Sequence, residues 1–220
     1  MLGRHLTAAI VPGTWCCYRP ERPTSWDVGV PLGPEPPYRD GVPRRRFAVA
    51  LLIPPPTSVE IDVLRRALGD RQLGRIEPHI TLVPPINLRE DDIADALAVV
   101  QVAARRSSPM ALTLGPVDTF GESSPVRFLA VDPWEPVTDL CRACWSGVLE
   151  RKERRPFHPH VTVDIDGGTT DGRDPALDLL AGYRAEVLVD RVTVLEDVDV
   201  DDPVLKRTWE PYTGYRLGVG

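Results

Sequence analysis

Hydrophobic residues from position 44 onward fall into short runs with the two-residue period of strands, separated by stretches with a helical period. The runs are rich in β-branched residues and are bounded by Pro and Gly, as strands usually are. Pro84-Pro85 should stop the second run, because proline cannot donate to a β-ladder. Strands are predicted at 47–53, 76–83, 111–114, 127–131 and 160–165, within 187–194, and at 209–217.

Helices are predicted between these strands. Thr57-Ser58-Val59-Glu60 has the spacing of a capping box, which predicts a helix that begins here and fades near Gly69. Further helices are predicted at 90–105 and 138–150, with a short one at 176–183. The order of elements, with sheet predominating, predicts an α+β fold.

Residues 1–43 show neither period. They contain eight of the 24 prolines, including a run from Pro31 to Pro37. Such a composition is typical of an extended chain without a packed core. We therefore predict a Pro-rich N-terminal extension at 1–43 and a folded domain at 44–218.

The folded domain contains an internal repeat. A shift of 81 residues aligns segment 46–83 with segment 127–164 without a gap. Each copy reads strand, proline turn, helix with a leading Thr, loop and strand, so two equivalent units should face each other across a pseudo-twofold axis. The identical residues are Arg46-Phe47 and Arg127-Phe128, Pro55 and Pro136, Thr57 and Thr138, Leu68 and Leu149, Pro78-His79 and Pro159-His160, and Thr81 and Thr162.

Each copy ends in a His-x-Thr motif. Residues i and i+2 of a strand share one face, so His79 with Thr81, and His160 with Thr162, should project together into one cleft. Two imidazoles can act as the base and the acid of phosphodiester hydrolysis, and each threonine hydroxyl can donate to a phosphate oxygen. One His-x-Thr on its own is weak evidence, but its recurrence in matched context favours a functional pair.

The segments Pro78-His79-Ile80-Thr81-Leu82 and Pro159-His160-Val161-Thr162-Val163 resemble the two signatures of the 2H phosphoesterase superfamily, in particular its 2'-5' RNA ligase and RNA 2',3'-cyclic phosphodiesterase branch. The resemblance implies two pseudo-symmetric β-sheet lobes flanked by helices around a central cleft. It also implies metal-free opening of a 2',3'-cyclic phosphate, usually to a 2'-phosphate, and in some members reversible 2'-5' joining of RNA ends. His79 and His160 would be catalytic, and Thr81 and Thr162 would bind the phosphate.

The net charge of −6 leaves the substrate open, because affinity for long nucleic acid depends on Lys and Arg. One alternative is a small cyclic nucleotide such as an ADP-ribose cyclic phosphate, acted on by the same mechanism. Another is a non-catalytic module that binds nucleotides or RNA ends. Candidate ligand contacts beyond the motifs are Arg75, Arg127, Arg154 and Arg155 for phosphate, Phe157 and Trp134 for a base, and the flanking His158.

The four cysteines are too few and too unevenly placed for a disulfide framework, which indicates a reducing compartment. Because no apolar stretch has membrane-spanning length, we expect a cytoplasmic protein. We also expect a monomer. Cys141-x-x-Cys144 with His158-x-His160 has zinc-ligand chemistry and is the alternative to two-histidine catalysis. Because a zinc site would leave the His79 motif unexplained, we expect no metal and no cofactor.

Overall fold

The computed structural model describes residues 43–120, 124, 126–150, 156–165, 180–202 and 204–219. The N-terminal extension up to residue 42, Arg154, Arg155 and most of the helix expected at 176–183 lie outside the described residues.

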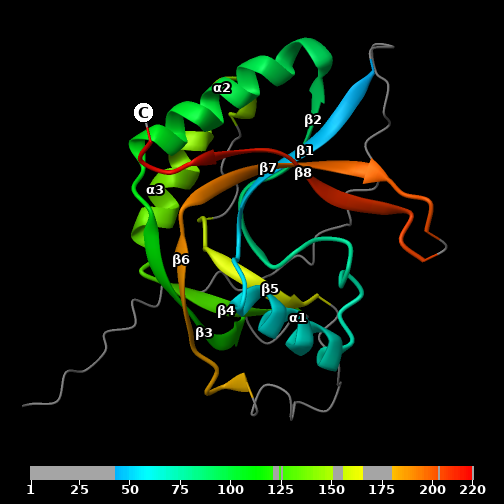
Figure 1. The fold of residues 1–220 in the computed structure, drawn as a ribbon, viewed down its shortest axis with the longest axis vertical. Coiled ribbons are helices and arrows are strands. Elements are labelled where there is room, and N and C mark those ends of the chain that lie inside the picture. Colours follow the sequence, from blue (N-terminus) through cyan, green and yellow to red (C-terminus); the bar gives the residue numbers. More distant parts are fainter. Residues whose placement is uncertain are drawn as a thin grey trace, which may run out of the picture.

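The described residues form one eight-stranded sheet with every neighbouring pair antiparallel, in the order β6-β3-β4-β5-β2-β1-β7-β8 (Figure 1). Three α-helices complete these elements, so the predicted α+β class is confirmed. The strands are β1 (Arg44–Leu52), β2 (His79–Arg89), β3 (Met110–Thr119), β4 (Arg127–Asp132), β5 (His160–Asp164), β6 (Ala185–Val189), β7 (Arg191–Asp199) and β8 (Arg207–Arg216).

The two repeat copies meet at the centre of the sheet. Ile80 of β2 pairs with Val161 of β5, and these two positions differ by the repeat offset of 81 (161 − 80). On either side, β1 flanks β2 and β4 flanks β5. The pseudo-twofold axis therefore passes between β2 and β5, and the two predicted lobes are the two halves of one continuous sheet.

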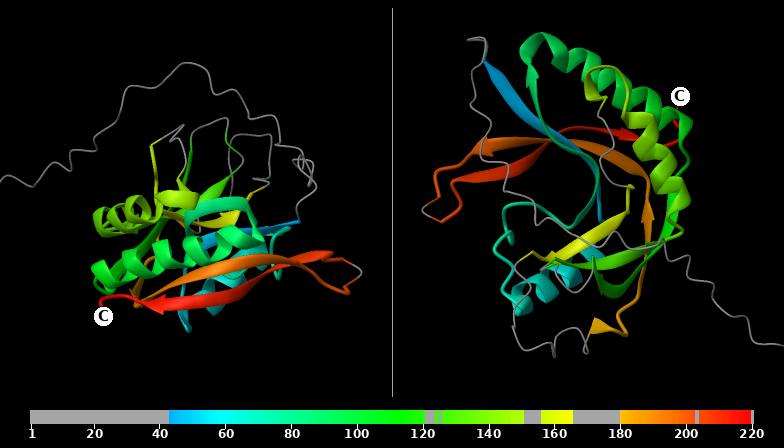
Figure 2. Two further views of the ribbon diagram at one scale, coloured as in Figure 1. Left: turned by 90° about the horizontal axis from the view of Figure 1, so that it is seen from above. Right: turned by 180° about the vertical axis from the view of Figure 1, so that it is seen from behind.

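The helices are α1 (Thr57–Leu68), α2 (Glu90–Arg106) and α3 (Glu135–Cys144), followed by the short 3₁₀ helix η1 (Gly147–Leu149). Helices α2 and α3 lie side by side, whereas α1 lies apart from them and contacts β5 (Figures 1 and 2). Helix α2 presents its apolar stripe, which includes Ile93, Ala96 and Val100, to the sheet.

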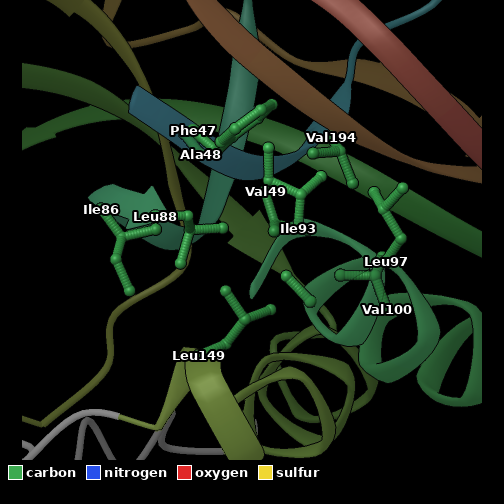
Figure 3. Close-up of a pocket in the computed structure, with 11 residues that line it drawn as sticks. Phe47, Ala48, Val49, Ile86, Leu88, Ile93, Leu97, Val100, Leu149 and Val194 are labelled. Carbon is green, nitrogen blue, oxygen red and sulfur yellow. The ribbon is translucent and has the colours of Figure 1, made fainter. Parts of the chain in front are cut away.

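The core between the sheet and α2 is closely packed. A void of about 10 Å³ remains there, lined only by apolar side chains such as Phe47, Leu88 and Leu149 (Figure 3). A space of this size holds at most one water molecule, and these side chains offer it no polar partner. The void therefore belongs to the hydrophobic core and is not a ligand site.

Two predictions about prolines and caps were wrong. Strand β2 continues through Pro84 and Pro85 to Arg89, because both prolines sit in a bulge, where Ala48 of β1 faces two residues of β2. The predicted capping box is absent: the N-cap of α1 is Pro56, with no side-chain cap, and Thr57 is already helical. The end of α1 was predicted correctly, since Gly69 takes the left-handed C-cap conformation with φ +75°.

Other element boundaries also differ from the prediction. The helix expected at 138–150 begins at Glu135, ends at Cys144, and gives way to η1. The segment 187–194 is not one strand, because Asp190 separates β6, which pairs with β3, from β7, which pairs with β1 and β8. Helix α2 extends one residue beyond the predicted end at 105.

Candidate active site

The two His-x-Thr motifs share one face of the sheet. Ile80, Leu82, Val161 and Val163 are fully buried, while the histidines and threonines between them are half-buried on the opposite face. Because Ile80 pairs with Val161 in antiparallel register, His79 lies across from Thr162, and Thr81 lies across from His160. Directly opposed residues have Cβ atoms about 4.5–5.5 Å apart, so all four side chains form one cluster.

Both histidines are held by the same backbone contact. The Nδ1 of His79 lies 2.7 Å from the carbonyl oxygen of Glu77, and the Nδ1 of His160 lies 2.7 Å from that of His158. A carbonyl oxygen only accepts hydrogen bonds, so Nδ1 must be the donor in each pair. In the neutral rings the proton is therefore on Nδ1, and Nε2 carries a free lone pair that can accept a proton.

A cavity of about 380 Å³ opens over the centre of the sheet beside this cluster. His79, Thr81 and Thr162 line it, and Ala48 and Ala50 of β1 also contribute to its lining. Its volume lies within the range of small-molecule sites. The wall includes Gln72 and Pro78 from the loop after α1, together with Trp209 of β8.

His160 is not among the residues that line this cavity. Its ring stands edge-on to Phe120 and Phe128, with centroids 5.0 and 5.3 Å away, and lies beside His158 at 6.4 Å. The structure therefore brings the four predicted residues together on one face, with three of them in the cavity wall and His160 packed against aromatic rings next to Thr81.

Burial favours the neutral form of both imidazoles. It lowers the pKa of His79 to about 4, and the positive charges of Arg65 and His160 act in the same direction. Burial also lowers the pKa of His160, and His158 adds to this effect. An anion bound between the two rings would favour the imidazolium form and raise both pKa values.

The residues that line the cavity but were not predicted from the sequence include Arg65, Gln72 and Trp209. Arg65 is 3% exposed, and its guanidinium donates to Asp70 at 2.8 Å and to Asp62 and the Ile76 carbonyl at 2.9 Å. The sequence signal for Arg65 was its spacing of four residues after Ile61, which places a charge on the apolar stripe of the helix. No comparable pattern marks Gln72 or Trp209.

Among the described residues, the other ligand contacts predicted from the sequence do not line the cavity. Arg127 is buried and pairs with Asp164 at 3.0 Å. Phe157 packs against the core, whereas Trp134 is 50% exposed at the start of α3. His158 is exposed. Arg75 contributes its carbonyl oxygen, which accepts hydrogen bonds from Thr208 and Trp209.

The two cysteines of the alternative zinc site do not line the cavity. Cys141 and Cys144 are buried on α3, and the thiol of Cys141 donates to the Leu82 carbonyl at 3.2 Å. Burial raises the pKa of Cys144 to about 12. Within the described ranges, no three His, Cys, Asp or Glu side chains converge as a metal-binding group.

In the same ranges, no helix is long and apolar enough to span a membrane.

Similar sequences agree on the class of protein. A sequence model described as "2'-5' RNA ligase superfamily" matches residues 53–201. A Bacillus licheniformis protein named "Putative phosphoesterase" is 28% identical over 152 residues, which are 68% of this chain and 86% of that protein. A Halalkalibacterium halodurans protein with the same name is 27% identical over 148 residues, 65% of this chain and 81% of that protein.

Solved structures show the same fold. The apo crystal structure of E. coli LigT superposes with a TM-score of 0.58 at 19% identity, covering 79% of this chain and 98% of LigT. LigT complexed with 3'-AMP gives 0.58 at 16% identity with the same coverage. A Thermus thermophilus protein, TT0787, gives 0.55 at 18% identity, again covering 79% and 98%.

Proposed function

The chain belongs to the 2'-5' RNA ligase superfamily of phosphoesterase-type enzymes, and we propose that it opens a 2',3'-cyclic phosphate by metal-independent catalysis with His79 and His160. Thr81 and Thr162 hold the phosphate between the two rings. The reaction ends at a 2'-phosphate, and the same site is a candidate for 2'-5' joining of RNA ends.

The proposed step needs one water molecule and both histidines. One imidazole takes a proton from water on its Nε2, and the water oxygen attacks phosphorus. The bond between phosphorus and the 3' oxygen breaks, and the other imidazolium gives its proton to that oxygen. The products are a 2'-phosphate and a free 3'-hydroxyl, and the two rings have exchanged protonation states. Proton exchange with solvent restores the starting state.

The matched Nδ1 contacts carry this proposal. Glu77 and His158 occupy equivalent positions in the two repeats (158 − 77 = 81), and each carbonyl binds Nδ1 of the histidine two residues later at 2.7 Å. Each Nε2 is thereby left to exchange protons with a substrate. Symmetric acid and base roles require two rings prepared in this same way.

The substrate side of the proposal rests on the cavity. A volume of about 380 Å³ suits a mononucleotide or the terminal nucleotide of an RNA, and Trp209 in its wall is the candidate for stacking on a base. The crystal complex of LigT with 3'-AMP supports a nucleotide ligand for this fold. We propose a nucleoside 2',3'-cyclic phosphate as the minimal substrate, either free or at an RNA end.

The test is hydrolysis of a 2',3'-cyclic mononucleotide in excess EDTA by the wild type and by the His79→Ala and His160→Ala variants. We expect turnover that survives chelation and falls by several orders of magnitude in both variants. Arg66→Gln is the control, because it changes an exposed side chain of α1 that does not line the cavity. Tight nucleotide binding without turnover would indicate a binding module, and loss of activity only on chelation would indicate a metal enzyme.

A second assay separates the two substrate sizes. The kcat/KM for a cyclic mononucleotide is compared with that for an RNA oligomer ending in a 2',3'-cyclic phosphate. A strong preference for the oligomer would mean that binding extends beyond the cavity, whereas equal values would mean that the terminal nucleotide is the whole recognised unit.

A further inference from the structure

The loop between α1 and β2 presents three consecutive carbonyl groups, each bound by a different element. The Arg75 carbonyl accepts from the Trp209 backbone N–H at 2.8 Å and from the Thr208 hydroxyl at 3.0 Å. The Ile76 carbonyl accepts from Nη1 of Arg65 at 2.9 Å. The Glu77 carbonyl accepts from His79 at 2.7 Å. We call residues 75–77 the carbonyl segment.

Arg65 holds this segment rigidly from inside α1. Its Nε donates to Asp70 at 2.8 Å and its Nη1 also donates to Asp62 at 2.9 Å, so the fork is fixed on two sides before it reaches Ile76. Arg65 and Asp70 are both buried, with exposed fractions of 3% and 6%. Charge-assisted hydrogen bonds of this geometry have little freedom to rearrange.

The second repeat has no arginine at the position equivalent to Arg65. Position 65 of the first repeat corresponds to position 146 of the second (65 + 81), which is the exposed Ser146. His79 therefore has the guanidinium of Arg65 in its own repeat, whereas the equivalent position in the repeat of His160 is a serine. Among the residues that the structure describes, the charged or titratable groups near His79 include Arg65 from α1, Asp70 and Glu77 from the loop, and His160 from β5.

We propose that Arg65 is a positioning residue for His79: it fixes the Ile76 carbonyl and, through it, the adjacent Glu77 carbonyl that orients the ring and its tautomer. This inference rests on the proposed function. The charge of Arg65 also opposes protonation of His79. The two histidines should therefore differ in how readily they take up a proton, although their motifs are the same.

The test uses two variants that separate geometry from charge. Arg65→Lys keeps the positive charge but loses the planar guanidinium with its several donors. We therefore expect kcat to fall about 10²-fold while the pH dependence of kcat stays unchanged. Arg65→Gln loses both, so kcat should fall similarly and the limb of the profile that reports His79 should move to higher pH. KM should change little in either variant. Arg66→Gln, an exposed arginine next to Arg65, is the matched control and should behave as the wild type.

Arg65→Gln leaves Asp70 buried without its cation, so the double variant with Asp70→Asn is measured beside it, and thermal unfolding checks that each protein is folded. An NMR pH titration of the His79 ring gives a readout that needs no turnover. The role of Arg65 would be overturned if the Arg65→Gln protein were folded, kept the wild-type kcat, and showed the wild-type titration of His79. Absence of turnover in the wild type would instead overturn the proposed function, and the titration would still test Arg65.

Discussion

Ile80 and Val161 pair across the central strands, and both side chains are fully buried. This one pair sets the register of both His-x-Thr motifs, because a slip of one residue would turn every side chain of a strand to the opposite face. The apolar core beneath the sheet therefore fixes the alignment of His79 with Thr162 and of Thr81 with His160.

Ile80→Ala should lower the free energy of unfolding by about 2–5 kcal/mol, because it empties a fully buried site in a packed core. Urea unfolding followed by circular dichroism measures this loss. Val63→Ala on the exposed face of α1, where Val63 is 56% exposed, is the control and should change stability by less than about 0.5 kcal/mol. Equal losses in both variants would contradict the central role given to the Ile80 pair.

Thr81→Val and Thr162→Val should each lower kcat by about 10²-fold, because valine keeps the strand-forming shape and removes the hydroxyl that donates to phosphate. The serine variants keep a hydroxyl and should recover most of the loss. Steady-state kinetics with a 2',3'-cyclic mononucleotide provides the measurement. If the valine variants kept full kcat, the threonines would have a structural role only.

The grouping of the four candidate residues on one face was predictable because strand period and repetition are local signals. His79, Thr81, His160 and Thr162 were found by their spacing, and the pairing of Ile80 with Val161 matches the repeat offset. Arg65 and Trp209 were missed because they reach the site through tertiary contacts with residues 75–77. The passage of β2 through Pro84-Pro85 was missed for a similar reason, since the bulge depends on the partner strand β1.

Trp209→Ala should raise KM for a cyclic mononucleotide about tenfold and leave kcat nearly unchanged, because stacking on a base contributes about 1–3 kcal/mol to binding. Trp209→Phe should keep most of the affinity. Trp134→Ala, which removes an exposed indole at the start of α3, is the matched control. An unchanged KM in Trp209→Ala would place the base elsewhere.

The lowered pKa of His79 also predicts how stability depends on pH. In the unfolded chain the pKa of His79 is about 6.5, whereas in the folded protein burial lowers this pKa to about 4. Between these values the unfolded state binds more protons, so the free energy of unfolding should fall as the pH drops from about 6.5 towards 4. His160 and His158, whose pKa values are also lowered, should contribute in the same direction.

His79→Asn isolates the part due to His79, because asparagine can still donate to the Glu77 carbonyl but does not titrate. The wild type should lose more stability than this variant between pH 6.5 and 4, as measured by urea unfolding at each pH. Inorganic phosphate should reduce the difference, because an anion in the cavity favours the imidazolium and raises the pKa of His79. Parallel curves for the two proteins would mean that His79 titrates normally in the folded state, and that neither its burial nor Arg65 sets its protonation.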